Sequence, residues 1–166
     1  LINKKDKLVF INFSTLTIDG LFINQDISAF TEVNNANLMT SIGPLLAIIQ
    51  NMIEAKWGRI ILLSSTRGLR GDVGISPYSI SKSSLVGLSN SLSKEYAKFN
   101  ITSNVINLGY FDSPLWESIP ENKRKQLIKQ IPSRRTGKAD DLVPLFQCLI
   151  KSNYINGAHI DLDGGL

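Results

Sequence analysis

The stretch Arg59-Ile60-Ile61-Leu62-Leu63 decides the fold class of this sequence of 166 residues. A continuous apolar run without polar alternation is typical of a β-strand that is covered on both faces. The segment before it, Ile27 to Trp57, repeats apolar residues at spacings of three and four, which predicts a long helix that ends at Gly58. A buried strand directly after such a helix favours a parallel sheet with flanking helices.

The same alternation of strands and helices continues on both sides of this stretch. Strands are predicted at Lys7 to Phe13, Ile101 to Leu108 and Ala158 to Asp163. Helices are predicted from Pro77 to Phe99, as short pieces within Ser113 to Arg135, and from Lys138 to Ile150, with a glycine loop at Gly68, Gly71 and Gly74. This order predicts an α/β fold, a Rossmann-like, doubly wound parallel sheet with flanking helices, of which about four strands are visible.

The composition is typical of a globular protein in a reducing compartment. Eighteen Lys and Arg against fourteen Asp and Glu give a formal charge of +4, which excludes neither a nucleic-acid-binding protein nor an enzyme. The single cysteine, Cys148, cannot form an internal disulfide, and no Cys/His cluster suits zinc, so we expect a cytoplasmic protein without a metal site. Leu8 to Phe13, the apolar run near the N-terminus, is too short for a signal sequence or a membrane span, so no membrane association is expected.

Tyr78 and Lys82 stand four residues apart at the start of the Ser-rich helix, so both side chains lie on one face of it. A lysine ammonium beside a phenol stabilises the phenolate, which makes such a pair a proton donor and acceptor. Taken alone, a tyrosine and a lysine at this spacing are more often a surface tyrosine and a solvated lysine than a functional pair. Ser64 and Ser65 follow the buried strand at its carboxyl end, where open α/β sheets bind ligands. Ser65 is either a loop or cap serine, or a donor that polarises a carbonyl oxygen.

Three segments together resemble the short-chain dehydrogenase/reductase family, especially its members of the three-oxoacyl carrier-protein reductase type. They are Gly58 to Ser65, Tyr78-Ser79-Ile80-Ser81-Lys82, and Ile101 to Gly109. The resemblance runs from about Leu8 to Leu166, and its Ser, Tyr, Lys spacing is specific. It implies an oxidoreductase that transfers hydride between a nicotinamide and a small-molecule ketone or secondary alcohol, of which a 3-oxoacyl thioester is one example.

The resemblance implies a role for each residue of the catalytic set. Tyr78 is expected to deliver a proton to the carbonyl oxygen, Ser65 to hydrogen-bond that oxygen, and Lys82 to support Tyr78 and hold the nicotinamide ribose. Asn37 matches the helix asparagine of the family, which helps to anchor a water in the proton relay. Alternatively, Asn37 is a polar residue bonding the backbone in a kinked helix.

The cofactor that the resemblance implies is NADP or NAD. Besides Tyr78 and Lys82, the residues expected near it are Asn12, Gly109, Phe111 and Ser113. Ser113 matches a family threonine that contacts the cofactor carboxamide. Ser113-Pro114 is equally typical of a helix start, with Ser as N-cap and Pro at the first helical position.

The departures from the family concern the nucleotide. The sequence has no glycine-rich turn for a pyrophosphate and no residue that selects NAD or NADP at the ribose 2′ position, so the preference cannot be read. We therefore interpret residues 1–166 as the C-terminal catalytic part of a single domain, and expect a first βαβαβ half before Leu1. Ser14 and Thr15 stand where the family has small residues and would crowd a cofactor. The alternative function is a fragment or subunit of this type without cofactor binding, acting as a non-catalytic interaction partner.

Two surface patterns bear on partners. Ser83, Gly87 and Ser91 form a stripe of small residues, typical either of a helix packed on its own sheet or of the dimer or tetramer interface that the resemblance implies. Between Glu121 and Lys138 there are seven basic residues and one acid. They form either a solvated helical face or a docking surface for an acidic carrier protein or an anionic substrate. No aromatic residues alternate with these charges, so nucleic acid is not expected.

Overall fold

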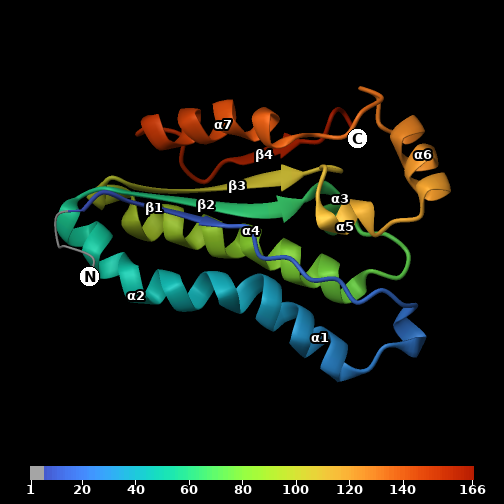
Figure 1. Ribbon diagram of the computed structural model, residues 1–166. Helices are drawn as coiled ribbons and strands as arrows, with labels where there is room; N and C mark the ends of the chain where they lie inside the picture. The colour runs from blue at the N-terminus through green and yellow to red at the C-terminus, as the bar shows by residue number, and fades with distance from the viewer. Residues whose placement is uncertain (1–5) are drawn as a thin grey trace.

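The computed structural model describes residues 6–166 and confirms the α/β fold predicted from the sequence. Its centre is a sheet of four parallel strands (Figure 1), in the order β1 (Leu8–Asn12), β2 (Gly58–Ser65), β3 (Ile101–Leu108) and β4 (His159–Leu162). Gly58 pairs with Ile101 and Ser65 with Leu108, so β2 and β3 end at the same level. Because all strands run in one direction, the segments that follow them meet at one end of the sheet.

Helices cover both faces of this sheet (Figure 1). One face carries α1 (Ile27–Asn34), α2 (Thr40–Ala55) and α4 (Ser76–Tyr96), and the other carries α7 (Ala139–Lys151). A π-helical turn, η2 (Asn35–Met39), joins α1 to α2 without interruption. The shorter helices are η1 (Phe22–Asn24), α3 (Thr66–Arg70), η3 (Ala97–Phe99), α5 (Pro114–Glu117) and α6 (Glu121–Gln130).

Two hydrophobic cores, one on each face, hold the sheet between its helices. The first packs the sheet against α2 and α4 through Leu45, Met52, Ile60, Leu62, Leu85, Ile101 and Val105. The second packs it against α7 through Ile61, Leu63, Ile106 and Leu149. Because β2 gives alternate residues to the two cores, every one of its residues is buried, and its sequence therefore shows no polar alternation.

The end of the long helix differs from the prediction. The helix ends at Ala55 rather than Trp57, because Lys56 adopts a left-handed backbone with a φ of 50°. Gly58 is the first residue of β2 and not the helix stop. An ideal Cβ at Gly58 would lie 2.6 Å from the Met52 sulfur, so a glycine is needed there because the helix and the strand pack closely.

The predicted glycine loop is also partly helical. Thr66–Arg70 forms α3, which includes Gly68, while Gly71 and Gly74 remain outside helices with positive φ values of 76° and 79°. The cap at Ser65, described below, stabilises this short helix at its start. Gly71 and Gly74 keep the loop character that the sequence predicts, because a positive φ favours glycine.

One helix among the described residues is long and apolar enough to cross a membrane by length and composition alone. It runs from Ile27 to Ala55, and its most apolar window of 18 residues has a mean hydropathy of 1.3. The core helices of globular proteins pass the same test, and here Leu45 and Met52 pack into the first core. Only 22% of that window is buried, and Leu46 of α2 is among the exposed apolar residues.

Candidate functional site

Ser65 is the last residue of β2 and caps the helix that follows. Its Oγ accepts a hydrogen bond from the backbone N–H of Gly68 at 3.2 Å, which confirms the interpretation of Ser65 as a cap serine. That bond does not use the hydroxyl hydrogen, and no hydrogen bond from it to another part of residues 6–166 occurs. Ser65 therefore keeps one donor for a ligand oxygen at the carboxyl end of β2.

Lys82 is buried in the second turn of α4, and its ammonium is held by backbone carbonyls. Nζ donates to the carbonyl oxygens of Ser14 at 3.1 Å and Leu63 at 3.0 Å. Burial away from water lowers the pKa of Lys82 from 10.5 to about 8. An ammonium has three hydrogens, so one remains for a further acceptor.

Tyr78 lies in the first turn of α4, directly after Pro77. The centre of its ring is 5.9 Å from the Lys82 ammonium, so the predicted placement of the two side chains on one helix face is confirmed. The side chain is half-buried, and within the described part of the chain its hydroxyl makes no hydrogen bond. The phenol is therefore free to meet a ligand while the positive charge beside it is fixed in place.

Gly68 brings Ser65 and Lys82 close together. An ideal Cβ at Gly68 would lie 2.9 Å from the Cβ of Lys82 and 3.4 Å from the Cβ of Ser65. The helix α3 therefore passes directly against Lys82, which a residue with a side chain would disturb. Ser65 and Tyr78 thus both lie near Lys82, close to the carboxyl end of β2, where the sequence predicts a ligand site.

Asn37 lies in the π-helical turn η2, and its side chain hydrogen-bonds to Leu16 and Ser81. Its Oδ1 accepts from the backbone N–H of Leu16 at 2.6 Å, and its Nδ2 donates to the Leu16 carbonyl at 2.9 Å and to Ser81 Oγ at 2.9 Å. Asn37 thus bonds backbone from a π-helical turn, as its alternative interpretation expects, but the bonded backbone is that of Leu16 in the loop after β1 and not that of its own helix. Its role in a proton relay stays a prediction.

Ser81 is a residue of the site that the sequence analysis did not single out. It is buried, accepts from Asn37 and donates to the Tyr78 carbonyl at 2.8 Å. The available signal is its place three residues after Tyr78, because helical serines bond to carbonyls one turn back. Nothing in the local sequence indicates the partner on η2, which is 44 residues away.

Asn12 ends β1, and its side chain is hydrogen-bonded within the protein at both Nδ2 and Oδ1. Its Nδ2 donates to Thr40 Oγ1 at 3.2 Å and to Ser41 Oγ, and its Oδ1 accepts from the Ser14 backbone N–H at 2.8 Å. Asn12 therefore shapes the turn that carries the Ser14 carbonyl to Lys82. Its role as a cofactor ligand stays a prediction.

The remaining predicted cofactor residues follow β3. An ideal Cβ at Gly109 would lie 2.7 Å from the Cα of Asp163, so Gly109 lets the ends of β3 and β4 approach closely. The Phe111 ring covers Gly137. Ser113 Oγ accepts from the Trp116 backbone N–H at 3.2 Å, which confirms it as the N-cap of α5. All three lie beyond the carboxyl end of the sheet, and their contact with a cofactor stays a prediction.

The basic segment is largely a solvated helical face. Helix α6 buries no residue, and Lys125 pairs with Glu121 at 2.7 Å. Arg135 forms two hydrogen bonds with Asp141, at 2.7 and 2.9 Å, and the same pairing lowers the pKa of Asp141 to about 2. Arg135 is therefore neutralised, while Lys123 and Lys129 remain exposed on α6. No group of three or more His, Cys, Asp or Glu side chains that could hold a metal occurs in residues 6–166.

The free donors decide whether a nicotinamide cofactor fits this site. Within residues 6–166, the third hydrogen of Lys82, the Tyr78 hydroxyl and the Ser65 hydrogen make no hydrogen bond, and such donors suit a ribose hydroxyl and a carbonyl oxygen. The residues present therefore fit the nicotinamide end of a dinucleotide. The sequence contains no glycine-rich turn for its pyrophosphate.

Comparison with known proteins shows that this chain is similar to reductases. The family described as enoyl-(acyl carrier protein) reductase matches residues 8–166. The chain is 33% identical over 160 residues to a 3-oxoacyl-(acyl-carrier-protein) reductase of Chlamydia trachomatis, and 30% identical over 161 residues to the protein of that name from Pseudomonas aeruginosa. It is also 30% identical over 160 residues to an acetoacetyl-CoA reductase from an Acinetobacter species. These matches cover 95–96% of the chain but only 64–65% of each relative, so the chain spans less than two thirds of their length.

Proposed function

The chain belongs to the short-chain dehydrogenase/reductase family, and on that premise we propose that it is an NAD(P)-dependent oxidoreductase acting on a ketone or secondary alcohol. The observation that carries this proposal is the Lys82 ammonium 5.9 Å from the Tyr78 ring, with Ser65 held against the same lysine by Gly68. This trio supplies a proton, a hydrogen bond and a fixed positive charge at one place.

In the reducing direction, Ser65 and Tyr78 both act on the carbonyl oxygen of the substrate. The Ser65 hydrogen bond stabilises the negative charge that develops on this oxygen, and the Tyr78 hydroxyl gives it a proton. A bound reduced nicotinamide would supply the hydride that forms the new C–H bond. Tyr78 is then left as a phenolate, which the neighbouring Lys82 ammonium stabilises until a proton returns from solvent.

The proposed substrate is a 3-oxoacyl thioester, and the proposed macromolecular partner is an acidic carrier protein. The names of the relatives support the substrate, since two are reductases of 3-oxoacyl groups on a carrier protein and one is a reductase of acetoacetyl-CoA. The exposed basic side chains of α6 support the proposal of an acidic partner, because the positive charges of Lys123 and Lys129 lie at the surface and can attract an acidic protein.

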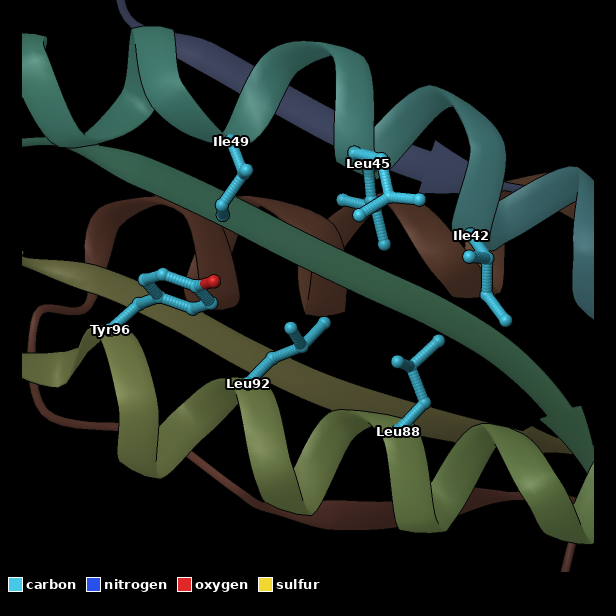
Figure 2. A pocket seen from close by; sticks show the side chains of 7 residues that line it. Ile42, Leu45, Ile49, Leu88, Leu92 and Tyr96 are labelled. Atoms are coloured by element: carbon cyan, nitrogen blue, oxygen red, sulfur yellow. The ribbon is translucent and has the colours of Figure 1, made fainter.

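We also propose that a second copy of the chain covers an apolar groove between α2 and α4. Figure 2 shows side chains of α2 pointing toward those of α4, and the residues that line the groove are Ile42, Leu45, Leu46, Ile49, Leu88, Leu92 and Tyr96. Leu46 is 73% exposed, and the small-residue stripe Ser83, Gly87, Ser91 is exposed rather than packed on the sheet. A two-fold pair would bury these helices against their counterparts.

Binding of NADPH and NADH to the full chain, followed by nicotinamide fluorescence, tests the proposed function. Saturable binding of either cofactor is the expected result. If the full chain binds neither cofactor, the proposal of an oxidoreductase is rejected and the alternative of a non-catalytic subunit is favoured. The observation that favours this alternative is that two of the three Lys82 hydrogens are already bonded to backbone carbonyls.

A further inference from the structure

Ser81 links the π-helical turn η2 to the turn of α4 that carries Tyr78. Its Oγ accepts a hydrogen bond from Asn37 Nδ2 at 2.9 Å and donates one to the Tyr78 carbonyl at 2.8 Å. Both Asn37 and Ser81 are fully buried. The hydroxyl is thus used as acceptor and donor at once, between the π-helical turn η2 and the first turn of α4.

The far end of this link is equally well fixed. Asn37 holds the backbone of Leu16 at both its N–H, at 2.6 Å, and its carbonyl, at 2.9 Å. Leu16 belongs to the loop after β1, and the same loop donates from Gly20 N–H to the Gly74 carbonyl at 2.8 Å, just before α4. The loop after β1 is therefore tied to the beginning of α4 in three ways: through Asn37 and Ser81, through the Gly20–Gly74 backbone bond, and through the bond from Lys82 Nζ to the Ser14 carbonyl.

The link differs from the ordinary serine bonds of the same helix. Ser84 and Ser93 also donate to the carbonyl three residues earlier, at 2.7 and 2.9 Å. Within residues 6–166, neither of these two hydroxyls accepts a hydrogen bond from another helix. Only the acceptance from Asn37 converts the local bond of Ser81 into a connection across the fold.

We infer that Ser81 is a positioning residue for the proposed reaction. Through its two hydrogen bonds it couples the position of Tyr78 to that of Asn37 and the Leu16 loop. The bond to the Tyr78 carbonyl restrains the turn from which the phenol projects toward Lys82 and Ser65. Loss of the Ser81 hydroxyl leaves one buried N–H of Asn37 without its acceptor, and such a group is unfavourable in a protein interior. The first turn of α4 and the Leu16 loop then loosen together. This inference rests on the proposed function only for its catalytic consequence.

The test compares Ser81→Ala with Ser84→Ala in the full chain. Ser84→Ala is the matched control because it removes the same kind of helical bond without the connection to Asn37. We expect Ser81→Ala to raise hydrogen exchange at the Leu16 amide by about 10-fold, and to lower kcat by about 10- to 100-fold with KM changed less than about two-fold. Ser84→Ala should leave both nearly unchanged. Ser81→Thr, which restores the hydroxyl, should recover much of the lost kcat.

Equal exchange at the Leu16 amide in the two alanine variants would overturn the inference, whatever the activity. Equal loss of kcat in both variants would also overturn it, because the effect would then belong to the helix and not to the link. If Ser81→Ala does not fold, Ser81→Cys keeps the volume with a weaker donor and acceptor, and the same two comparisons apply. If the wild-type chain reduces no carbonyl substrate, the proposed function fails, while the Leu16 exchange still decides whether the link exists.

Discussion

The Nζ atom of Lys82 lies 5.9 Å from the centre of the Tyr78 ring and is held there by hydrogen bonds to two backbone carbonyls. One carbonyl belongs to Leu63 in the central strand, and the other belongs to Ser14 in the loop after β1. The positive charge is therefore fixed beside the phenol before any ligand arrives. Such preorganisation is what a proton-transfer site requires, because no side chain has to reorient during the reaction.

The buried charge of Lys82 makes stability depend on pH. Burial lowers the pKa of Lys82 to about 8 from 10.5, so between these values the unfolded chain binds more proton than the folded one. The contribution of this group to the free energy of unfolding therefore rises with pH, by about 3 kcal/mol in total. Relative to Lys82→Met, the wild type should gain most of this amount between pH 7.5 and 10.5 in urea unfolding. The neutral amine still has hydrogens for the Ser14 and Leu63 carbonyls. A difference that stays constant or falls over this range would contradict the account.

Replacement of Gly68 by Ala places a methyl group against Lys82 and Ser65. An ideal Cβ there would lie only 2.9 Å from the Cβ of Lys82, so α3 or Lys82 must shift. We expect a loss of about 1–3 kcal/mol in the free energy of unfolding, together with lower turnover. Gly43→Ala is the matched control, because Gly43 is helical, does not line the proposed interface groove, and has no side chain or distant backbone atom within 4 Å of an ideal Cβ. The control should be more stable than wild type by about 0.5–1 kcal/mol. Similar effects of both changes would show that the close packing at Gly68 has no consequence.

A charge in the groove between α2 and α4 should separate the proposed dimer. Leu46→Glu puts a carboxylate on an apolar surface that a second copy would bury, so sedimentation velocity should show a monomer. Ile27→Glu is the control, because Ile27 is 81% exposed on α1 and does not line the groove. It should leave the wild-type mass unchanged. A dimer that survives Leu46→Glu would mean that the groove is not the interface.

The elements of the fold were predictable because buried strands and amphipathic helices have local patterns. Ile101–Leu108 forms β3 as the sequence predicts, and the predicted Lys7 to Phe13 strand is Leu8–Asn12 in the structure. The short helix α3 was not predictable, because it depends on the bond between Ser65 and the Gly68 backbone.

The side chains of the candidate site were predictable from the sequence, but the hydrogen bonds that hold them in place were less so. The four-residue spacing of Tyr78 and Lys82 places them on one helix face in the sequence and in the structure. The acceptors of the Lys82 ammonium are backbone carbonyls, which no residue type reveals. The bond between Asn37 and Ser81 joins residues 44 apart, beyond the reach of any helical or strand period.

The most direct test of the central claim compares the full wild-type chain with Tyr78→Phe in the NADPH- or NADH-dependent reduction of acetoacetyl-CoA. The change removes the proton donor and leaves the ring beside Lys82, so cofactor affinity should stay within about two-fold while kcat falls by about 10²- to 10⁴-fold. A Tyr78→Phe protein that binds the cofactor and keeps the wild-type kcat would contradict the role of Tyr78, and with it the proposed reaction.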